Sequence, residues 1–132
     1  MKTYYSSEEQ KANRKIWATA LRSGKYQQGS SRLKTDDGAF CCLGVACDVS
    51  DIVTWKGTQP VIDGHYHSDA YLSPPMRDWL GLRTDSGEYY YGGGRRVLAW
   101  MNDHDGATFE QIADIIESEP EGLLECTKPM VA

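Results

Sequence analysis

The sequence has no apolar run approaching the roughly 20 residues of a membrane-spanning helix, and its first residues contain no apolar signal-peptide segment. We therefore expect a cytoplasmic protein without a membrane partner. A surplus of basic residues is also missing, because 19 acidic and 14 basic residues give a net charge of −5. DNA and RNA binding depends on neutralising phosphates, so this balance argues against either nucleic acid as a partner. It leaves room for a small anionic ligand, which needs only a local cluster of donors.

Standard signatures of catalysis and cofactor binding are absent as well. The sequence has no P-loop, no G-x-G-x-x-G and no cysteine-enzyme motif. Phenylalanine is scarce while tyrosine is common, with two residues against eight. Because tyrosine carries a polar hydroxyl, this bias favours wet surfaces and binding sites over a dry core. We expect no cofactor, and a binding protein rather than an enzyme.

The chain of 132 residues is long enough to bury a real core in one domain. Capping boxes at residues 6–9 and 108–111 each precede an apolar helical stripe, and Ser73 before two prolines is typical of another helix start. These signals predict a single α+β domain of about five short helices with short β-hairpins. We place this domain at residues 1–119 and a C-terminal tail at residues 120–132.

The apolar positions predict one core shared by these helices. In the first helix, Ala12, Ile16 and Ala20 form a stripe with Trp17 and Leu21 beside it. The residues expected to meet in the core are Trp17, Leu21, Leu43, Val45, Trp79, Leu80, Leu98, Phe109, Ile112 and Ile116.

Three of the four cysteines fall in one apolar window, residues 40–48. Unreactive cysteines are often buried, so Cys41, Cys42 and Cys47 are expected to be reduced core thiols without a metal. Two alternatives stay open. A helix N-terminus could activate Cys41 or Cys42 as a nucleophile, and histidines elsewhere could complete a zinc site. The paired C-x₂₋₄-C spacing of structural zinc sites is missing, however.

The strongest functional signal is the segment at residues 89–96, which contains three tyrosines, three glycines and two arginines. The tyrosines and glycines lead into a helix expected at residues 95–102, and the arginines are the first two residues of that helix. Glycines let backbone N–H groups approach an anion, and a helix N-terminus carries partial positive charge. Arginines add bidentate donors for phosphate, and tyrosine rings can stack on a nucleobase. The alternative is a flexible hairpin tip with solvated arginines. The residues assigned to this ligand site are Arg95, Arg96, Gly93, Gly94, Tyr89 and Tyr91.

A second basic and polar group follows the first helix, and we assign Arg22, Tyr26 and Gln28 to the ligand site from it. This group could converge with the glycine–arginine segment or with a neighbouring subunit's copy. Sharing of a ligand between subunits would make the protein a homo-oligomer of closed symmetry. The alternative is a solvated connector.

Two motifs carry a resemblance to a known family. Residues 17–28 read W-x-x-A-L-R-S-G-x-Y-x-Q, and residues 41–48 read C-C-L-G-V-x-C-D. Across residues 16–117 the order of motifs resembles a family of small proteins of tailed phages, prophages and actinobacterial genomes. The resemblance implies a phage setting, with the host cytoplasm as location, and it implies no particular activity.

These observations together predict a non-catalytic phage accessory protein that binds a small anionic ligand. In a phage setting, that role suggests sequestration of a host immune signalling nucleotide, an anti-defence function. Two alternatives remain open: a small cysteine- or metal-dependent enzyme, and an inhibitor that binds a host protein.

Overall fold

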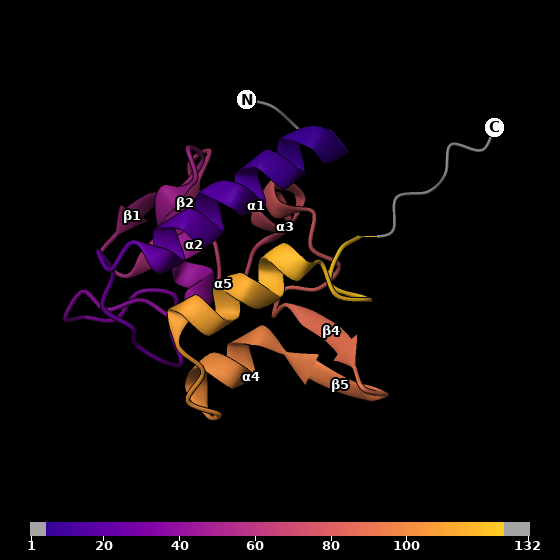
Figure 1. Cartoon of the computed structure of the whole chain (residues 1–132). Coiled ribbons are helices and arrows are strands. Elements are labelled where there is room, and N and C mark those ends of the chain that lie inside the picture. The colour runs from indigo at the N-terminus through magenta and orange to yellow at the C-terminus, as the bar shows by residue number, and fades with distance from the viewer. Residues whose placement is uncertain (1–4, 126–132) are drawn as a thin grey trace.

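The structure is a computed structural model that describes residues 5–125, and within them it contains five helices and two small antiparallel sheets (Figure 1). In chain order the elements are α1 (Ser7–Arg22), α2 (Cys42–Val49), β1 (Thr54–Lys56), β2 (Gln59–Ile62), β3 (His65–Tyr66), α3 (Pro74–Leu80), β4 (Glu88–Tyr91), β5 (Gly94–Val97), α4 (Leu98–Asp103) and α5 (Phe109–Ser118). The expected α+β class is confirmed. None of the described helices is long and apolar enough to span a bilayer.

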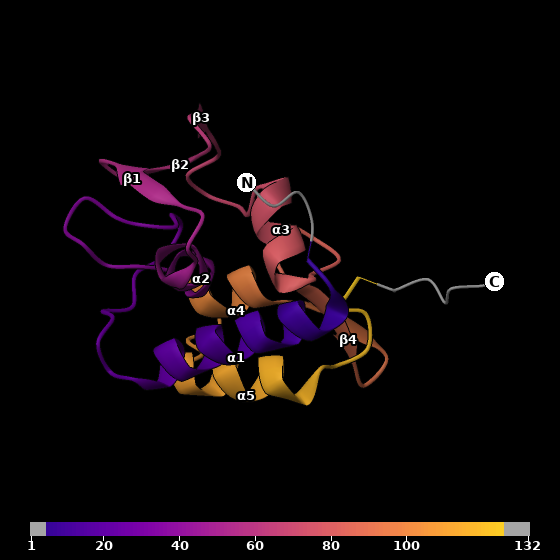
Figure 2. The same cartoon turned by 90° about the horizontal axis from the view of Figure 1, so that it is seen from above.

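Helix α1 is the element around which the other helices pack. Its N-terminus is closed by the expected capping box, in which Ser6 and Glu9 each accept a hydrogen bond from the other's backbone N–H. Figure 2 shows α1 running beside α5, and α1 also contacts α2 and α3. All ten residues expected to form the core belong to one buried cluster.

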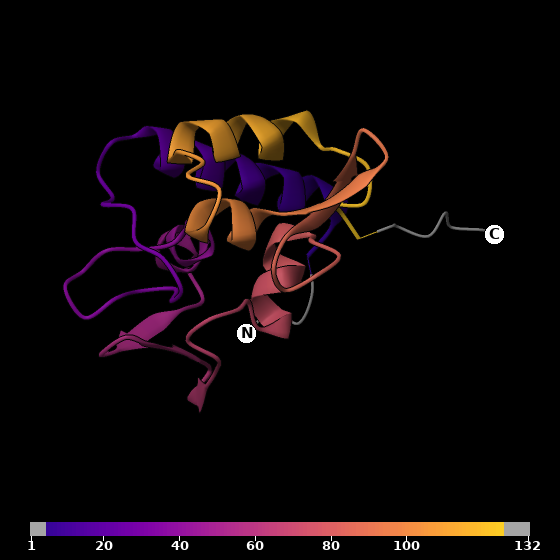
Figure 3. The ribbon, with the colours of Figure 1, turned by 90° about the horizontal axis from the view of Figure 1, so that it is seen from below.

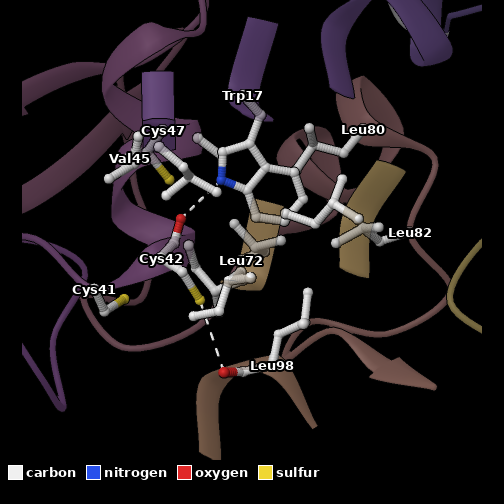
Figure 4. Packing of buried hydrophobic residues seen from close by; sticks show 14 of the residues in the cluster. Trp17, Cys41, Cys42, Val45, Cys47, Leu72, Leu80, Leu82 and Leu98 are labelled. Carbon is white, nitrogen blue, oxygen red and sulfur yellow. Dashed lines mark hydrogen bonds between the residues drawn. The ribbon is translucent and has the colours of Figure 1, made fainter. Parts of the chain in front are cut away.

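The centre of that core lies between α1 and α2. Trp17 is fully buried, and its indole Nε1–H donates to the carbonyl oxygen of Cys42 at 2.8 Å (Figure 4). In α2, Gly44 meets the backbone of the preceding loop, because a Cβ at this position would lie 1.7 Å from the carbonyl oxygen of Leu33. Only glycine allows the helix and loop to approach so closely.

The stripe of Ala12, Ile16 and Ala20 is not the buried face of α1, since the side chain of Ile16 is 47% exposed. Helix α1 instead turns Trp17, Ala18 and Leu21 inward, together with Arg14. The guanidinium of Arg14 donates to the carbonyl oxygen of Leu80 at 2.8 Å and pairs with the carboxylate of Glu119 at 3.2 Å, so its charge is compensated inside the packed domain. Ile16 therefore lies on the outer face of α1.

Residues 54–66 form a three-stranded antiparallel sheet in the order β1-β2-β3. The sheet extends away from the helices (Figure 2). It is attached through Ile62, which is 2% exposed, while His65 and Tyr66 of β3 face solvent.

The helix expected at residues 95–102 forms only from Leu98 onward, because the chain first makes a second strand, β5. Gly92 and Gly93 have φ angles of +60° and +79°, which suit a two-residue hairpin turn. The turn returns the chain as β5, with Tyr91 opposite Gly94 and Tyr89 opposite Arg96. Helix α4 starts only at Leu98.

The boundary expected at residue 119 falls inside the packed domain. Leu123 is fully buried, and its carbonyl oxygen accepts the backbone N–H of Arg83 at 2.9 Å. The carbonyl oxygen of Glu121 accepts the N–H of Tyr90 at 2.8 Å. Residues 120–125 are therefore an integral edge of the fold, and the rest of the expected tail lies outside the described residues.

Candidate functional site

A surface hollow of about 720 Å³ lies around α4 and β5. Figure 3 shows α4 leading on from the β4–β5 hairpin, beneath α1 and α5. Residues from several separate parts of the chain line the hollow: Ser31, Cys41, Ala70, Tyr71, Ser86, Arg95, Arg96, Val97, Ala99, Trp100, Met101, Asp103, His104 and Asp105.

Trp100 forms an exposed aromatic surface at this hollow. Leu98 and Asn102, one helical turn apart, are buried, so the position midway between them faces outward. The side chain of Trp100 is accordingly 57% exposed, and its ring stacks on that of His104 with centroids 3.9 Å apart. Tyr71, which is 49% exposed, adds a second aromatic ring to the lining.

The two arginines of β5 have different surroundings. Arg95 donates to Glu88 at 2.5 Å, and Arg83 donates to the same carboxylate at 2.9 Å. These two hydrogen bonds hold the pKa of Glu88 below its usual value. Arg96 lies on the opposite face of the strand and is exposed, with no side-chain hydrogen bond or ion pair within residues 5–125. Arg96 is therefore the β5 cation that remains available to an anion.

The glycines and tyrosines expected beside the arginines do not line this hollow. Tyr89 is 5% exposed, its hydroxyl lies 3.1 Å from the sulfur of Met101, and burial raises the pKa of this tyrosine. Tyr91 is exposed at the hairpin end and does not line the hollow. Gly93 and Gly94 build the turn and the start of β5 instead of a helix N-terminus. The expected glycine-flanked helix start is thus replaced by a hairpin.

Arg22 and Tyr26 are occupied elsewhere. Arg22 bridges α1 to α5 by pairing with Glu117 and with Asp114, the latter at 2.7 Å. The hydroxyl of Tyr26 donates to Asp48 at 2.5 Å, and burial together with this hydrogen bond raises the pKa of the tyrosine. Neither side chain lines the hollow, so the convergence expected from sequence does not occur for these two residues.

Gln28 supports the hollow from outside its lining. Its amide donates to Asn102 at 2.8 Å, and Asn102 in turn donates to Asp103 at 2.9 Å. Asp103 also accepts the backbone N–H of Ser31 at 3.0 Å, which holds Ser31 at a φ of +74°. The network pins the loop before α2 to α4 and satisfies Asp103, one of the two acidic groups at the hollow. The other is Asp105.

The three cysteines of the apolar window are buried and unpaired, as expected. Burial raises the pKa of Cys41 to about 11 and raises the pKa values of Cys42 and Cys47 as well. Because the thiolate is the reactive form, these side chains are poor nucleophiles at neutral pH. Within the part of the chain that the structure describes, no three His, Cys, Asp or Glu side chains are placed to hold a metal ion.

We expect the three buried thiols to react slowly with iodoacetamide in the native protein and quickly in urea. The physical reason is their low exposure combined with raised pKa values. Peptide mapping by mass spectrometry after short labelling would measure each site, with the unfolded protein as the control. Rapid native labelling of all three would contradict the buried placement.

Comparison with protein families assigns the chain to one of them. A family model described as "Domain of unknown function (DUF8296)" matches residues 9–120. The chain belongs to the DUF8296 family. No curated protein and no solved structure matches the chain. The residues that line the hollow all fall within the matched DUF8296 segment.

Sequence reasoning missed the aromatic part of this site in the DUF8296 domain. The sequence nevertheless contains a signal for Trp100: if Leu98 and Met101 face the core, helical spacing places Trp100 on the outer side of the helix. Tyr71 carries no such local signal, because its position at the hollow depends on how the segment after β3 packs against α4.

Proposed function

We propose that this protein is a non-catalytic binding protein that takes a small anionic molecule with a planar ring, such as a nucleotide, at the hollow beside Trp100. The observation that carries the proposal is an exposed arginine, Arg96, which has no ion-pair partner among residues 5–125 and lines the same hollow as the exposed indole of Trp100. A nucleotide presents both matching groups, because its base stacks on aromatic rings and its phosphate accepts guanidinium hydrogen bonds.

The size and chemistry of the hollow support this proposal. Its volume of about 720 Å³ lies within the range of small-molecule sites. Ser31 and Ser86 add polar groups to the lining, and His104 backs the ring of Trp100. The raised pKa of Cys41, the cysteine at the hollow, supports binding over nucleophilic catalysis.

The biological role that we propose is sequestration of a host signalling nucleotide by a phage protein. This part rests on the resemblance of the motifs at residues 17–28 and 41–48 to phage and prophage proteins. In this role the protein acts in the host cytoplasm, and we propose that it assembles as a homo-oligomer. Native mass spectrometry would count the subunits and detect any retained nucleotide.

Replacing Arg96 with alanine is expected to weaken nucleotide binding by about tenfold to a hundredfold, since a hydrogen bond to a charged group contributes roughly 1.5–3 kcal/mol. Calorimetry against linear and cyclic nucleotides and ADP-ribose would measure the loss. Asp105→Asn should instead tighten binding, because it removes a like charge from the hollow.

Arg32→Ala is the matched control, as Arg32 is an exposed arginine outside the hollow whose nearest carboxylate, on Asp36, is 3.9 Å away. It should bind like the wild type. Equal affinity of the Arg96 variant and the wild type would contradict the assignment, and a wild type that binds nothing in the panel would overturn the nucleotide proposal.

A further inference from the structure

Helix α1 carries a second apolar stripe beside its buried face, and of this stripe only Ala20 packs against the core. Ala12, Ile16 and Ala20 follow one another at four-residue spacing, and Ile16 is 47% exposed. Beside this stripe lies a second hollow, of about 420 Å³, where the end of α1 meets the following loop and the end of α2. We use the name α1 face for the surface that lines this hollow. Its residues are Lys15, Ile16, Thr19, Ala20, Ser23, Lys25, Tyr26 and Val49.

The charge of the α1 face is opposite to that of the chain as a whole. Its lining contains two lysines and no carboxylate, whereas the net charge of the chain is −5. Both Lys15 and Lys25 are exposed, and neither forms an ion pair within the described part of the chain. The face therefore offers two free cations around an apolar floor.

The aromatic side of the α1 face, formed by Tyr26, is held in place by two contacts. Tyr26 packs edge-to-face on Phe40 with centroids 5.2 Å apart, and its hydroxyl donates to Asp48. A single exposed isoleucine is ordinary on a protein surface. Here it borders a hollow with a fixed aromatic wall and two flanking cations, which is the pattern of a docking site with a polar rim.

We propose that the α1 face docks an acidic segment of a partner protein. An apolar side chain of that segment covers Ile16 and Ala20, while its flanking carboxylates pair with Lys15 and Lys25. Charge complementarity selects this occupant, because a basic segment would meet like charges on both sides of the hollow. The site is separate from the hollow at Trp100, so it gives the protein a macromolecular partner in addition to a small ligand.

The test uses a fluorescein-labelled synthetic peptide of leucine and glutamate residues in helical spacing, and a matched peptide with lysine in place of glutamate. Fluorescence anisotropy should show binding of the acidic peptide alone. Ile16→Ala should weaken that binding by about tenfold, since a central apolar anchor is expected to dominate such an interface.

The charge reversal Lys15→Glu with Lys25→Glu should abolish binding of the acidic peptide and create binding of the basic one. Lys56→Glu, a change at another exposed lysine, on β1, is the control and should leave both results unchanged. Unfolding melts of the variants separate a binding effect from a folding effect, because all these side chains are exposed.

Three outcomes would overturn the proposal: no binding of the acidic peptide, equal binding of both peptides, or binding insensitive to the α1 variants. Self-association of the protein that Ile16→Ala abolishes would assign the face to a second copy instead. None of these results bears on nucleotide binding at Trp100, so the two proposals fail independently.

Discussion

Replacing Trp17 with alanine is expected to lower the free energy of unfolding by about 3–5 kcal/mol. The side chain is fully buried between α1 and α2, so truncation leaves a large cavity in the core. It also removes the hydrogen bond from the indole to the carbonyl oxygen of Cys42. Urea melts followed by circular dichroism would measure the loss.

Trp100→Ala is the matched control for this prediction, because it makes the same chemical change at an exposed position. We expect a stability change within about 0.5 kcal/mol, as for most surface substitutions. A loss below about 1 kcal/mol for the Trp17 variant would contradict its central place in the core.

Gly44→Ala is expected to destabilise the protein by roughly 1–3 kcal/mol or more, the range for overpacked sites. In an ordinary helix the same change stabilises by about 1 kcal/mol, so the sign is diagnostic. The added Cβ would lie 1.7 Å from the carbonyl oxygen of Leu33, and a backbone atom cannot move aside as a flexible side chain can. The same urea melts provide the measurement.

Gly94→Ala tests whether the effect of Gly44→Ala is specific. Its nearest neighbour would be the carbonyl oxygen of Tyr91 at 3.7 Å, which is an ordinary contact, so we expect little change. A Gly44 variant as stable as the wild type would show that α2 and the loop carrying Leu33 are not packed as described.

Local sequence patterns predicted the elements whose ends depend on nearby residues. The caps at Ser6, Ser73 and Thr108 each form the expected hydrogen bond to a backbone N–H three residues on. These signals work because both partners lie within one helical turn of each other. The buried cysteine window was predicted for a similar reason, since its apolar character is continuous.

Features that depend on distant partners were not predictable in this way. The burial of Arg14 on α1 is one example, because its guanidinium donates to the carbonyl oxygen of Leu80, which is 66 positions away. The run Gly92 to Gly94 is compatible both with a broken strand and with a hairpin turn. Only the pairing of β4 with β5 shows that the run forms a hairpin turn.

At the candidate site, too, the partners that distinguish one arginine from another are distant in sequence. Arg95 and Arg96 are equivalent in sequence, and Glu88 across the hairpin distinguishes them by pairing with only the first. Arg22 was likewise expected at a ligand, whereas it pairs with two carboxylates of α5. Of the residues that the sequence assigned to a ligand site, only Arg95 and Arg96 line the hollow.

The most direct test of the central claim is an NMR titration of the ¹⁵N-labelled protein with ADP-ribose and with linear and cyclic nucleotides. The account predicts that the indole N–H of Trp100 and the Nε–H of Arg96 shift together, while the indole of the buried Trp17 stays unchanged. Signals from Trp100 and Arg96 that remain unmoved at saturating nucleotide would contradict it.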